Sequence, residues 1–311
     1  MARILVTGAA GFIGRALCLG FVERGHAVLG RSRRQADPIP GVELRPIGDI
    51  SANTDWSKHL DGVDVVVHLA NRAHRSSRDP AAGEEARAAG TLAHSGARAG
   101  IARLVHMSSI RAMGDATAPG APFRATDRPD PRDPYGRGKL SIERTLLGAA
   151  RESGIEVIIL RPPLVYGPGV KGNFRALLRL AATGLPLPFA DIENRRSLIF
   201  IDNLVDLVER VCVHPDAAGR ILLARDAADL STPELIRVLA AERGRPARLF
   251  RVPRPVMIGL CRLPMLGLPL SRLAASLQVD DAETRTVLNW QPPVSVEAGL
   301  AATAAALRRW P

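Results

Sequence analysis

Two side chains able to exchange a proton lie four residues apart in the segment "DPYGRGKLSIERTLL". Tyr135 is one of two tyrosines in the chain, and Lys139 is one of three lysines among 42 basic residues. The spacing after Pro134 predicts a helix that carries both side chains on one face. A phenol has a pKa of about 10, and a neighbouring ammonium stabilises the phenolate and lowers that value. The pair could therefore transfer a proton to or from a substrate oxygen at neutral pH.

A hydroxyl that polarises the same oxygen is expected close to this pair. The segment "LVHMSSIRAMG" is typical of a strand that ends at Ser108 and Ser109. Ligands of open parallel sheets bind at the carboxyl ends of the strands, so a serine here could donate a hydrogen bond to the reacting oxygen.

A third group of residues predicts a nucleotide site. The apolar run "RILVT" leads into "GAAGFIG", which places three glycines before a helical pattern. Such glycines allow a tight turn, a close approach of backbone to a pyrophosphate and close helix–strand packing, and the helix N-terminus then faces the phosphates. The predicted cofactor contacts of this loop are Gly8, Gly11, Phe12, Ile13 and Gly14.

The scaffold for these groups is predicted to be an α/β fold. Up to about residue 161, short runs of Val, Ile and Leu alternate with longer helical patterns, which indicates a parallel sheet covered on both faces. The sequence after residue 161 is first rich in Pro and Gly and then dominated by helical patterns. We expect a Rossmann-type, doubly wound domain from residues 1–164 and 197–225. Residues 165–196 and 226–311 are expected to form a smaller, discontinuous C-terminal substrate lobe.

The end of the second predicted strand bears on the choice of cofactor. Sites selective for NAD place a carboxylate here for the ribose 2′-hydroxyl, whereas a 2′-phosphate is served by arginine. The chain has Ser32 at this position, with Arg31, Arg33 and Arg34 around it. This pattern favours NADP(H) over NAD(H).

Together these motifs resemble the extended short-chain dehydrogenase/reductase superfamily, of the nucleotide-sugar epimerase and reductase type. The resemblance rests on the GxxGxxG spacing, "GDI" at Gly48–Ile50, "VVHLA" at Val66–Ala70, the Tyr135/Lys139 pair and "RPPLVYGPG". It implies that Ser109, Tyr135 and Lys139 are catalytic, with Tyr135 and Lys139 also touching the cofactor. The further cofactor contacts that it implies are Asp49, Ile50, Leu69, Ala70, Asn71 and Pro162.

The same resemblance implies a sugar substrate and narrows the reaction. Relatives that dehydrate nucleotide sugars carry an Asp-Glu pair after the catalytic hydroxyl residue, whereas Ile110 and Arg111 follow Ser109 here. Dehydration is therefore disfavoured, and oxidation or reduction at one carbon remains. The closest resemblance is to reductases of a UDP-4-keto-6-deoxy-N-acetylhexosamine that serve surface polysaccharide synthesis. A UDP-hexose 4-epimerase with retained NAD is the alternative, and a non-catalytic dinucleotide-sensing regulator is an alternative of another class.

Candidate substrate contacts follow from the matching positions of the family. Asn173 and Arg196 match residues that contact the pyrophosphate of a nucleotide sugar, and Arg272 is a third candidate. Ser108 and Arg111 are further candidates beside the catalytic serine. The family's usual asparagines near the sugar are replaced by Arg87 and Leu164, so the motifs specify the chemistry more closely than the sugar.

Composition excludes several other classes. The formal net charge is +11, but the basic residues form no long run and aromatic residues are only 4%, which argues against a nucleic-acid partner. Cys18, Cys212 and Cys261 have no metal-ligand or disulfide spacing. We expect a cytoplasmic protein without a membrane span or metal. The family resemblance also suggests a homodimer through Ala81–Ala99 and Tyr135–Ser153.

Overall fold

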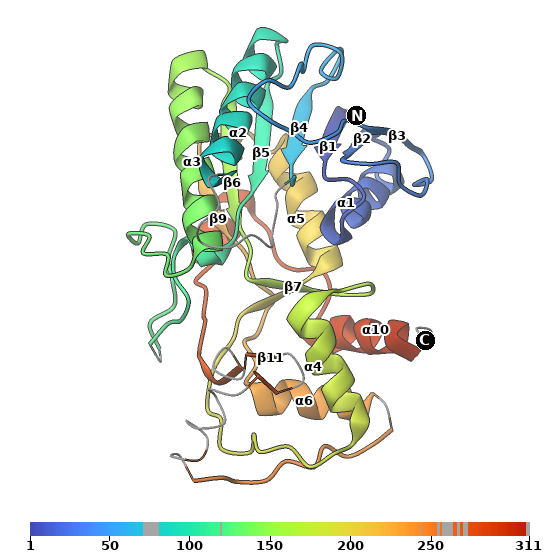
Figure 1. The fold of residues 1–311 in the computed structure, drawn as a ribbon, viewed down its shortest axis with the longest axis vertical. Helices are drawn as coiled ribbons and strands as arrows, with labels where there is room; N and C mark the ends of the chain where they lie inside the picture. The colour runs from blue at the N-terminus through green and yellow to red at the C-terminus, as the bar shows by residue number, and fades with distance from the viewer. Residues whose placement is uncertain are drawn as a thin grey trace.

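Seven parallel strands form the sheet in the upper half of the molecule (Figure 1). The computed structural model describes residues 1–70, 81–118, 120–242, 244–253, 256, 264–265, 268–269 and 273–308. The strand order is β3-β2-β1-β4-β5-β6-β9, and every neighbouring pair is parallel. The strands are β1 (Arg3–Thr7), β2 (Ala27–Ser32), β3 (Val42–Pro46), β4 (Val65–His68), β5 (Arg103–Met107), β6 (Glu156–Arg161) and β9 (Ile221–Leu223).

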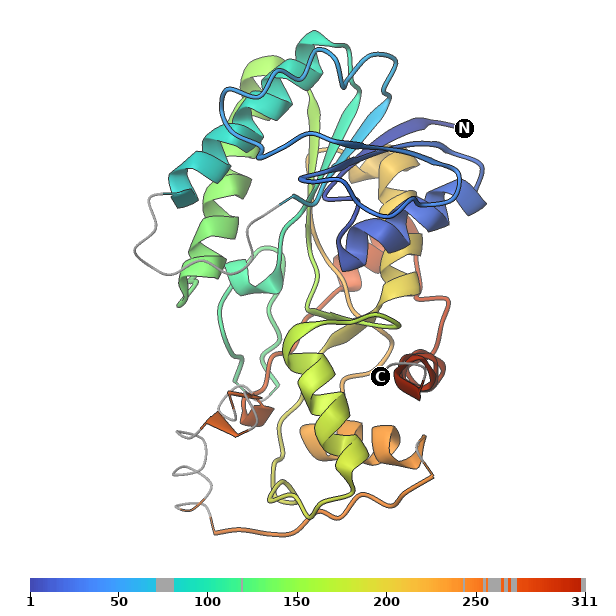
Figure 2. The same cartoon turned by 45° about the vertical axis from the view of Figure 1, so that its right-hand side comes forward.

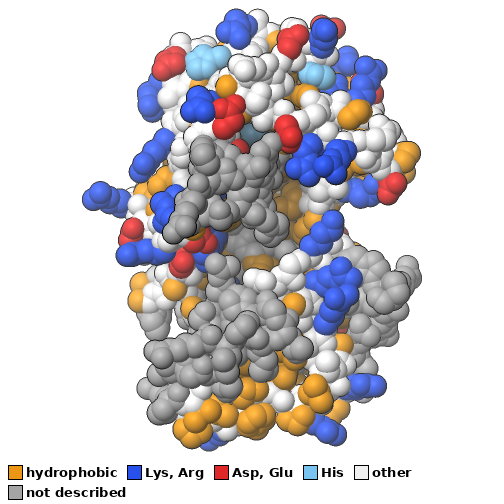
Figure 3. All heavy atoms as spheres, viewed as in Figure 1, with side chains coloured by type: hydrophobic (Ala, Val, Ile, Leu, Met, Phe, Trp, Pro, Cys, Tyr) orange, Lys and Arg blue, Asp and Glu red, His pale blue; other side chains and the backbone are white. Residues whose placement is uncertain are grey.

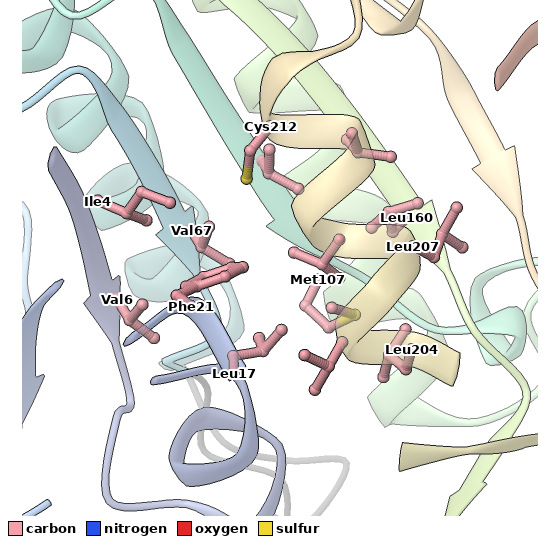
Figure 4. Packing of buried hydrophobic residues seen from close by; sticks show 14 of the residues in the cluster. Ile4, Val6, Leu17, Phe21, Val67, Met107, Leu160, Leu204, Leu207 and Cys212 are labelled. Atoms are coloured by element: carbon pink, nitrogen blue, oxygen red, sulfur yellow. The ribbon is translucent and has the colours of Figure 1, made fainter. Parts of the chain in front are cut away.

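Two pairs of helices cover the two faces of this sheet (Figure 2). Helices α1 (Phe12–Glu23) and α5 (Ile201–Val213) pack on one face, and α2 (Ala81–Arg98) and α3 (Pro134–Ser153) on the other. Side chains alternate along a strand, so Ile4 and Val6 contact the first pair while Leu5 contacts the second. Figure 4 shows the first of these cores, with Phe21 of α1 and Leu207 of α5 among its residues. The predicted doubly wound α/β fold is confirmed.

A second group of elements lies below the sheet in Figure 1 and has its own core. Strands β7 (Leu164–Tyr166) and β8 (Leu198–Phe200) form a separate two-stranded parallel sheet. Three helices pack with it: α4 (Gly172–Thr183), α6 (Thr232–Ala241) and α10 (Val296–Arg308). The remaining elements are η1 (Ile110–Ala112), η2 (Pro215–Ala217), β10 (Pro264–Met265), β11 (Leu268–Pro269) and α9 (Ala282–Leu288).

The division of the chain into two lobes stays a prediction, but two segments pack differently from it. Strand β8 pairs with β7 rather than with the large sheet, so residues 197–225 rejoin that sheet only through α5 and β9. Conversely, Leu288 and Trp290 belong to the core beneath α1 and α5. The Trp290 indole donates to Asp206 of α5 at 2.8 Å, which fixes the end of α9 on the half that contains the seven-stranded sheet.

The surface and the helices bear on the predicted partners. On the face drawn in Figure 3, Lys and Arg side chains are scattered over both halves rather than gathered in one stripe. None of the described helices is long and apolar enough to span a bilayer. Within the described ranges, no cluster of three or more His, Cys, Asp or Glu side chains could hold a metal ion, and Cys18 and Cys212 are buried free thiols.

Candidate active site

The glycine loop between β1 and α1 has the geometry of a phosphate-binding turn. Gly8 has a φ of 73°, which a side chain would disfavour, and a Cβ on Gly14 would lie 2.2 Å from the carbonyl oxygen of Gly8. Gly11 caps α1 without a side-chain hydrogen bond, and the first turn of the helix carries no acidic residue. No side chain neutralises the positive end of the α1 dipole, so this N-terminus can bind an anion such as the pyrophosphate of a dinucleotide.

The end of β4 lies directly against this loop. A Cβ on Gly8 would be 3.2 Å from the amide nitrogen of Ala70. Thr7 Oγ1 accepts hydrogen bonds from the amides of Leu69 and Ala70, both at 3.2 Å. The structure therefore brings these two predicted cofactor residues to the predicted phosphate site. Asn71 lies outside the described residues.

The four residues at the end of β2 do not all face the predicted cofactor site: Arg31 and Ser32 are buried, and the next two are exposed. The buried hydroxyl of Ser32 donates to the carbonyl oxygen of Arg34 at 2.7 Å. Arg31 is 3% exposed and donates to His59 Nδ1 at 3.1 Å, and burial lowers the pKa of its guanidinium. Arg31 is therefore part of the protein interior, contrary to the expectation that it helps to attract a 2′-phosphate.

Two exposed arginines remain at this end of the site. Arg34 is exposed, and Arg33 is 60% exposed with its Nη1 4.0 Å from Asp49 Oδ1. This places Arg33 beside a residue predicted to contact the adenine. Ile50 is partly buried against the core on the α2/α3 face.

The catalytic candidates come together at the start of α3. Asp133 caps the helix by accepting from the Gly136 amide at 2.7 Å, and Pro134 occupies its first turn. Ser109 lies close enough to Tyr135 for hydrogen bonding to lower the pKa of the phenol, and Ser109 Oγ accepts from the amide of Arg111 at 3.2 Å. Both are only partly buried, so a substrate oxygen could reach them.

Lys139 lies one turn further along the same helix and is 3% exposed. Its Nζ donates to the carbonyl oxygen of Met107 at 2.7 Å, which uses one of its three donors. Burial lowers the pKa of Lys139 to about 8, against the charges of Glu85 and Glu143, which raise it. The ammonium is thus charged at neutral pH.

The pKa of the Tyr135 phenol is raised, whereas the sequence predicted that it would be lowered. Burial raises the pKa of Tyr135, and the hydrogen bond with Ser109 lowers it only in part. The free protein therefore keeps Tyr135 protonated at neutral pH, as a proton donor must be.

The predicted substrate residues fall into two groups. The Ser108 hydroxyl donates to Glu143, and the Arg111 guanidinium pairs with Asp133 and, at 3.1 Å, with Asp115. Ser108 thus has a partner in α3, and Arg111 has one in the residue that caps α3. Both side chains are therefore bound within the protein, contrary to the expectation that they contact the substrate. Pro162 is buried and its carbonyl oxygen accepts from the amide of Ile110 at 2.9 Å.

The candidates for the sugar pyrophosphate come from the lower half of the molecule. Asn173 is exposed in the first turn of α4. Arg196 is partly buried and donates from Nη1 to the carbonyl oxygen of Ala275 at 3.0 Å. Arg272 lies outside the described residues.

Sequence reasoning missed several buried polar groups beneath the site. Thr7 accepts from two amides, so its own proton goes to His68 Nδ1, 2.9 Å away. Burial, together with the charge of Lys139, lowers the pKa of His68 to about 3, and His68 is therefore neutral. Glu143 and Arg161 form a second such group. A signal for Glu143 was present, because it stands four residues beyond Lys139.

A family comparison agrees with this geometry. The model of the NAD dependent epimerase/dehydratase family matches residues 4–223, and the chain therefore belongs to that family. Known proteins also match this chain along nearly its full length. The chain is 38% identical to a UDP-glucose 4-epimerase of Vibrio cholerae over 97% of this chain and 94% of the relative. It is 30% identical to a UDP-glucose 4-epimerase of Mycolicibacterium smegmatis over 97% of each.

Solved structures show the same fold. MoeE5 in complex with UDP-glucuronic acid and NAD is 25% identical, with a TM-score of 0.77 over 99% of both chains. MoeE5 in complex with UDP-glucose and NAD gives 26% identity and a TM-score of 0.76 over the same shares.

Proposed function

We propose that this protein is an NAD(P)-dependent oxidoreductase that acts at carbon 4 of a UDP-sugar. The observation that carries the proposal is the placement of three side chains at the carboxyl edge of the sheet: Ser109 after β5, and Tyr135 and Lys139 one turn apart on α3. The glycine loop lies at the same edge. The names of the relatives and the ligands of MoeE5 support a nucleotide sugar and a nicotinamide cofactor.

Each residue then has a chemical task. The nicotinamide, when bound, supplies or accepts the hydride. Tyr135 gives a proton to the oxygen on carbon 4 during reduction and removes it during oxidation. Ser109 donates a hydrogen bond to that oxygen, and Lys139 stabilises the phenolate and binds the nicotinamide ribose.

The finer proposal is the reduction of a UDP-4-keto-6-deoxy-N-acetylhexosamine for surface polysaccharide synthesis. Ile110 and Arg111 follow Ser109, so the acidic pair needed for dehydration is missing there. Ser32 stands where an NAD site would carry a carboxylate, and the exposed cations of Arg33 and Arg34 follow it. This environment supports NADPH, which suits an enzyme that exchanges its cofactor in every turnover.

A UDP-hexose 4-epimerase with retained NAD is the second candidate. It is favoured by the names of the two relatives and by the NAD in MoeE5. The same three catalytic residues would serve it, since an epimerase oxidises carbon 4 and reduces it again from the other side.

Purified protein distinguishes the two. Mass spectrometry of nucleotide released on denaturation should find no stoichiometric NAD for the reductase, and NADPH absorbance should fall on addition of a UDP-4-keto sugar. Bound NAD and interconversion of UDP-glucose and UDP-galactose without added cofactor would instead establish the epimerase. Turnover of neither substrate class would contradict the proposed chemistry and revive the regulator.

We further propose a cytoplasmic homodimer in which α2 and α3 meet their counterparts. These helices pack closely on each other, since a Cβ on Gly90 would lie 2.9 Å from the Thr145 side chain. Light scattering after gel filtration tests the oligomer. In the lower half, Arg196 and Asn173 are proposed to bind the pyrophosphate, so Arg196→Ala should raise KM more than it lowers kcat.

A further inference from the structure

The end of β5 is joined to α3 by three consecutive residues. The carbonyl oxygen of Met107 accepts from Lys139, and Ser109 lies beside Tyr135 and lowers its pKa. Between them the Ser108 hydroxyl donates to a carboxylate oxygen of Glu143. Glu143 stands one helical turn beyond Lys139, on the same face of α3. It thus continues the line of the two catalytic side chains into the protein interior.

Glu143 is itself held from the neighbouring strand. Arg161, the last residue of β6, donates from Nε at 3.0 Å and from Nη2 at 2.6 Å to the two carboxylate oxygens. The side chains are 1% and 2% exposed, so solvent does not screen the pair. The third nitrogen of Arg161 lies 2.7 Å from the sulfur of Met113, in the loop that follows Ser109. A forked guanidinium fixes both the position and the plane of the carboxylate.

We propose that Glu143, held by Arg161, is a positioning residue of this site: it sets Ser108 so that the adjacent Ser109 meets Tyr135, and its charge stabilises the ammonium of Lys139. This inference rests on the proposed function, because it assigns Glu143 a task only through the three catalytic residues. The Glu143 side chain is 1% exposed, so its task is assigned through the residues that it holds.

The groups around Lys139 show in which direction the charge of Glu143 shifts the pKa of the lysine. Glu85 of α2 and Glu143 of α3 raise the pKa of Lys139, while burial lowers it further than they restore. His68 of β4 and His106 of β5 also face the lysine, and burial lowers the pKa of each so far that both are neutral. Without the Glu143 charge only Glu85 would oppose burial, so the pKa of Lys139 would fall below its present value of about 8.

The chain offers a matched control at the opposite edge of the sheet. Arg103 of β5 donates to Glu156 of β6 from Nε at 2.8 Å and from Nη2 at 2.6 Å. This pair also links arginine and glutamate with two hydrogen bonds, but it lies at the amino ends of the strands. Glu156→Gln therefore removes the same charge without reaching the site.

The test compares Glu143→Gln with Glu156→Gln in the full chain. We expect kcat of Glu143→Gln to fall about ten- to hundredfold with little change in KM, because the reacting groups are displaced. The alkaline limb of its pH–rate profile should move down by about one pH unit, as expected for the loss of a nearby opposite charge. Glu156→Gln should reproduce the wild-type profile. A Glu143→Gln enzyme with the wild-type kcat and alkaline limb would overturn the inference.

Binding of NADH, followed by calorimetry as a function of pH, gives a measurement that needs no sugar. Wild-type affinity should decline as Lys139 loses its proton, and in Glu143→Gln this decline should begin at lower pH. If the wild type binds NADH but converts no UDP-sugar, the proposed function fails while this comparison still decides the role of Glu143. An unchanged pH dependence of binding would contradict it.

Glu143→Gln leaves Arg161 as a buried, unpaired cation and could fail to fold for that reason. The double substitution Glu143→Gln with Arg161→Gln removes both charges and retains groups that can hydrogen bond. It should restore folding and still show the shifted alkaline limb. A double variant with the wild-type pH profile would overturn the electrostatic role.

Discussion

The two ends of the same pair of strands, β5 and β6, carry similar side chains in different surroundings. At the amino ends, Arg103 also donates to the carbonyl oxygens of Val211 and His214, and Glu156 is 43% exposed. At the carboxyl ends, Arg161 and Glu143 are fully enclosed and connect to Ser108. The first pair joins strands to the end of α5, whereas the second connects to the groups that we propose transfer a proton. The exposure and the contacts of an arginine–glutamate pair thus differ between the two edges of the parallel sheet.

Among substitutions at the two edges, Tyr135→Phe at the carboxyl edge is expected to reduce turnover most. Removal of the hydroxyl takes away the proton donor, so turnover should fall by about 10²- to 10⁴-fold. The NADH dissociation constant should change little, since the ring remains. Stopped-flow or steady-state absorbance measures the first and calorimetry the second. A variant with wild-type turnover would remove Tyr135 from the mechanism.

Gly14→Ala should affect cofactor binding and stability together. The new Cβ would lie 2.2 Å from the backbone oxygen of Gly8, and backbone cannot yield as a flexible side chain can. Overpacking of this kind costs about 1–3 kcal/mol of unfolding free energy, and NADH affinity should fall because the phosphate turn is displaced. Urea unfolding and calorimetry measure the two effects.

Gly148→Ala is the matched control for that substitution. Gly148 lies in α3 with ordinary backbone angles, and its Cβ would meet only the Arg151 side chain at 4.0 Å. Alanine there should stabilise the helix by about 0.5–1 kcal/mol. Equal losses of NADH affinity in both variants would contradict a special role for the loop.

Ser32→Asp tests the cofactor end of the same edge. A carboxylate there would repel a 2′-phosphate and accept from a 2′-hydroxyl, so the ratio of kcat/KM for NADPH over NADH should fall by about tenfold or more. Arg45→Gln is a suitable control, because Arg45 is exposed on β3 and pairs with Glu43 at 3.1 Å. A ratio that already favours NADH in the wild type would contradict the NADPH proposal.

The smallest effect on activity is expected at the amino edge. Arg103→Ala leaves the carbonyl oxygens of Val211 and His214 without this donor, which should cost about 1–3 kcal/mol of unfolding free energy. The kcat of the folded enzyme should stay at the wild-type value. A large loss of kcat with an unchanged unfolding transition would break the distinction between the two edges.

Patterns within one segment predicted most of the fold and the centre of the site. The glycine turn depends on residues six apart in sequence, and the Tyr135/Lys139 face on a single helical turn. Uninterrupted apolar strands likewise indicated a sheet covered on both faces. Such features are encoded locally, so the sequence alone could place them.

The failures involve partners that are distant in sequence. Arg31 and Arg33 look alike in the sequence, but Arg31 is held in the interior by His59 and by Glu43 of the neighbouring strand. The pairing of Glu143 with Arg161 required the packing of α3 on β6. Strand β8 has only three residues, which is too short for its apolar pattern to indicate which sheet it joins.

Because the chain has only three lysines, acylation of Lys139 can be used to measure how often the site opens. Lys58 and Lys171 are exposed, whereas Lys139 is buried. An acylating reagent should therefore modify the first two rapidly and Lys139 only in molecules whose site has opened. The rate at which peptide mass spectrometry detects acylated Lys139 would measure the frequency of that opening, and bound cofactor should slow it.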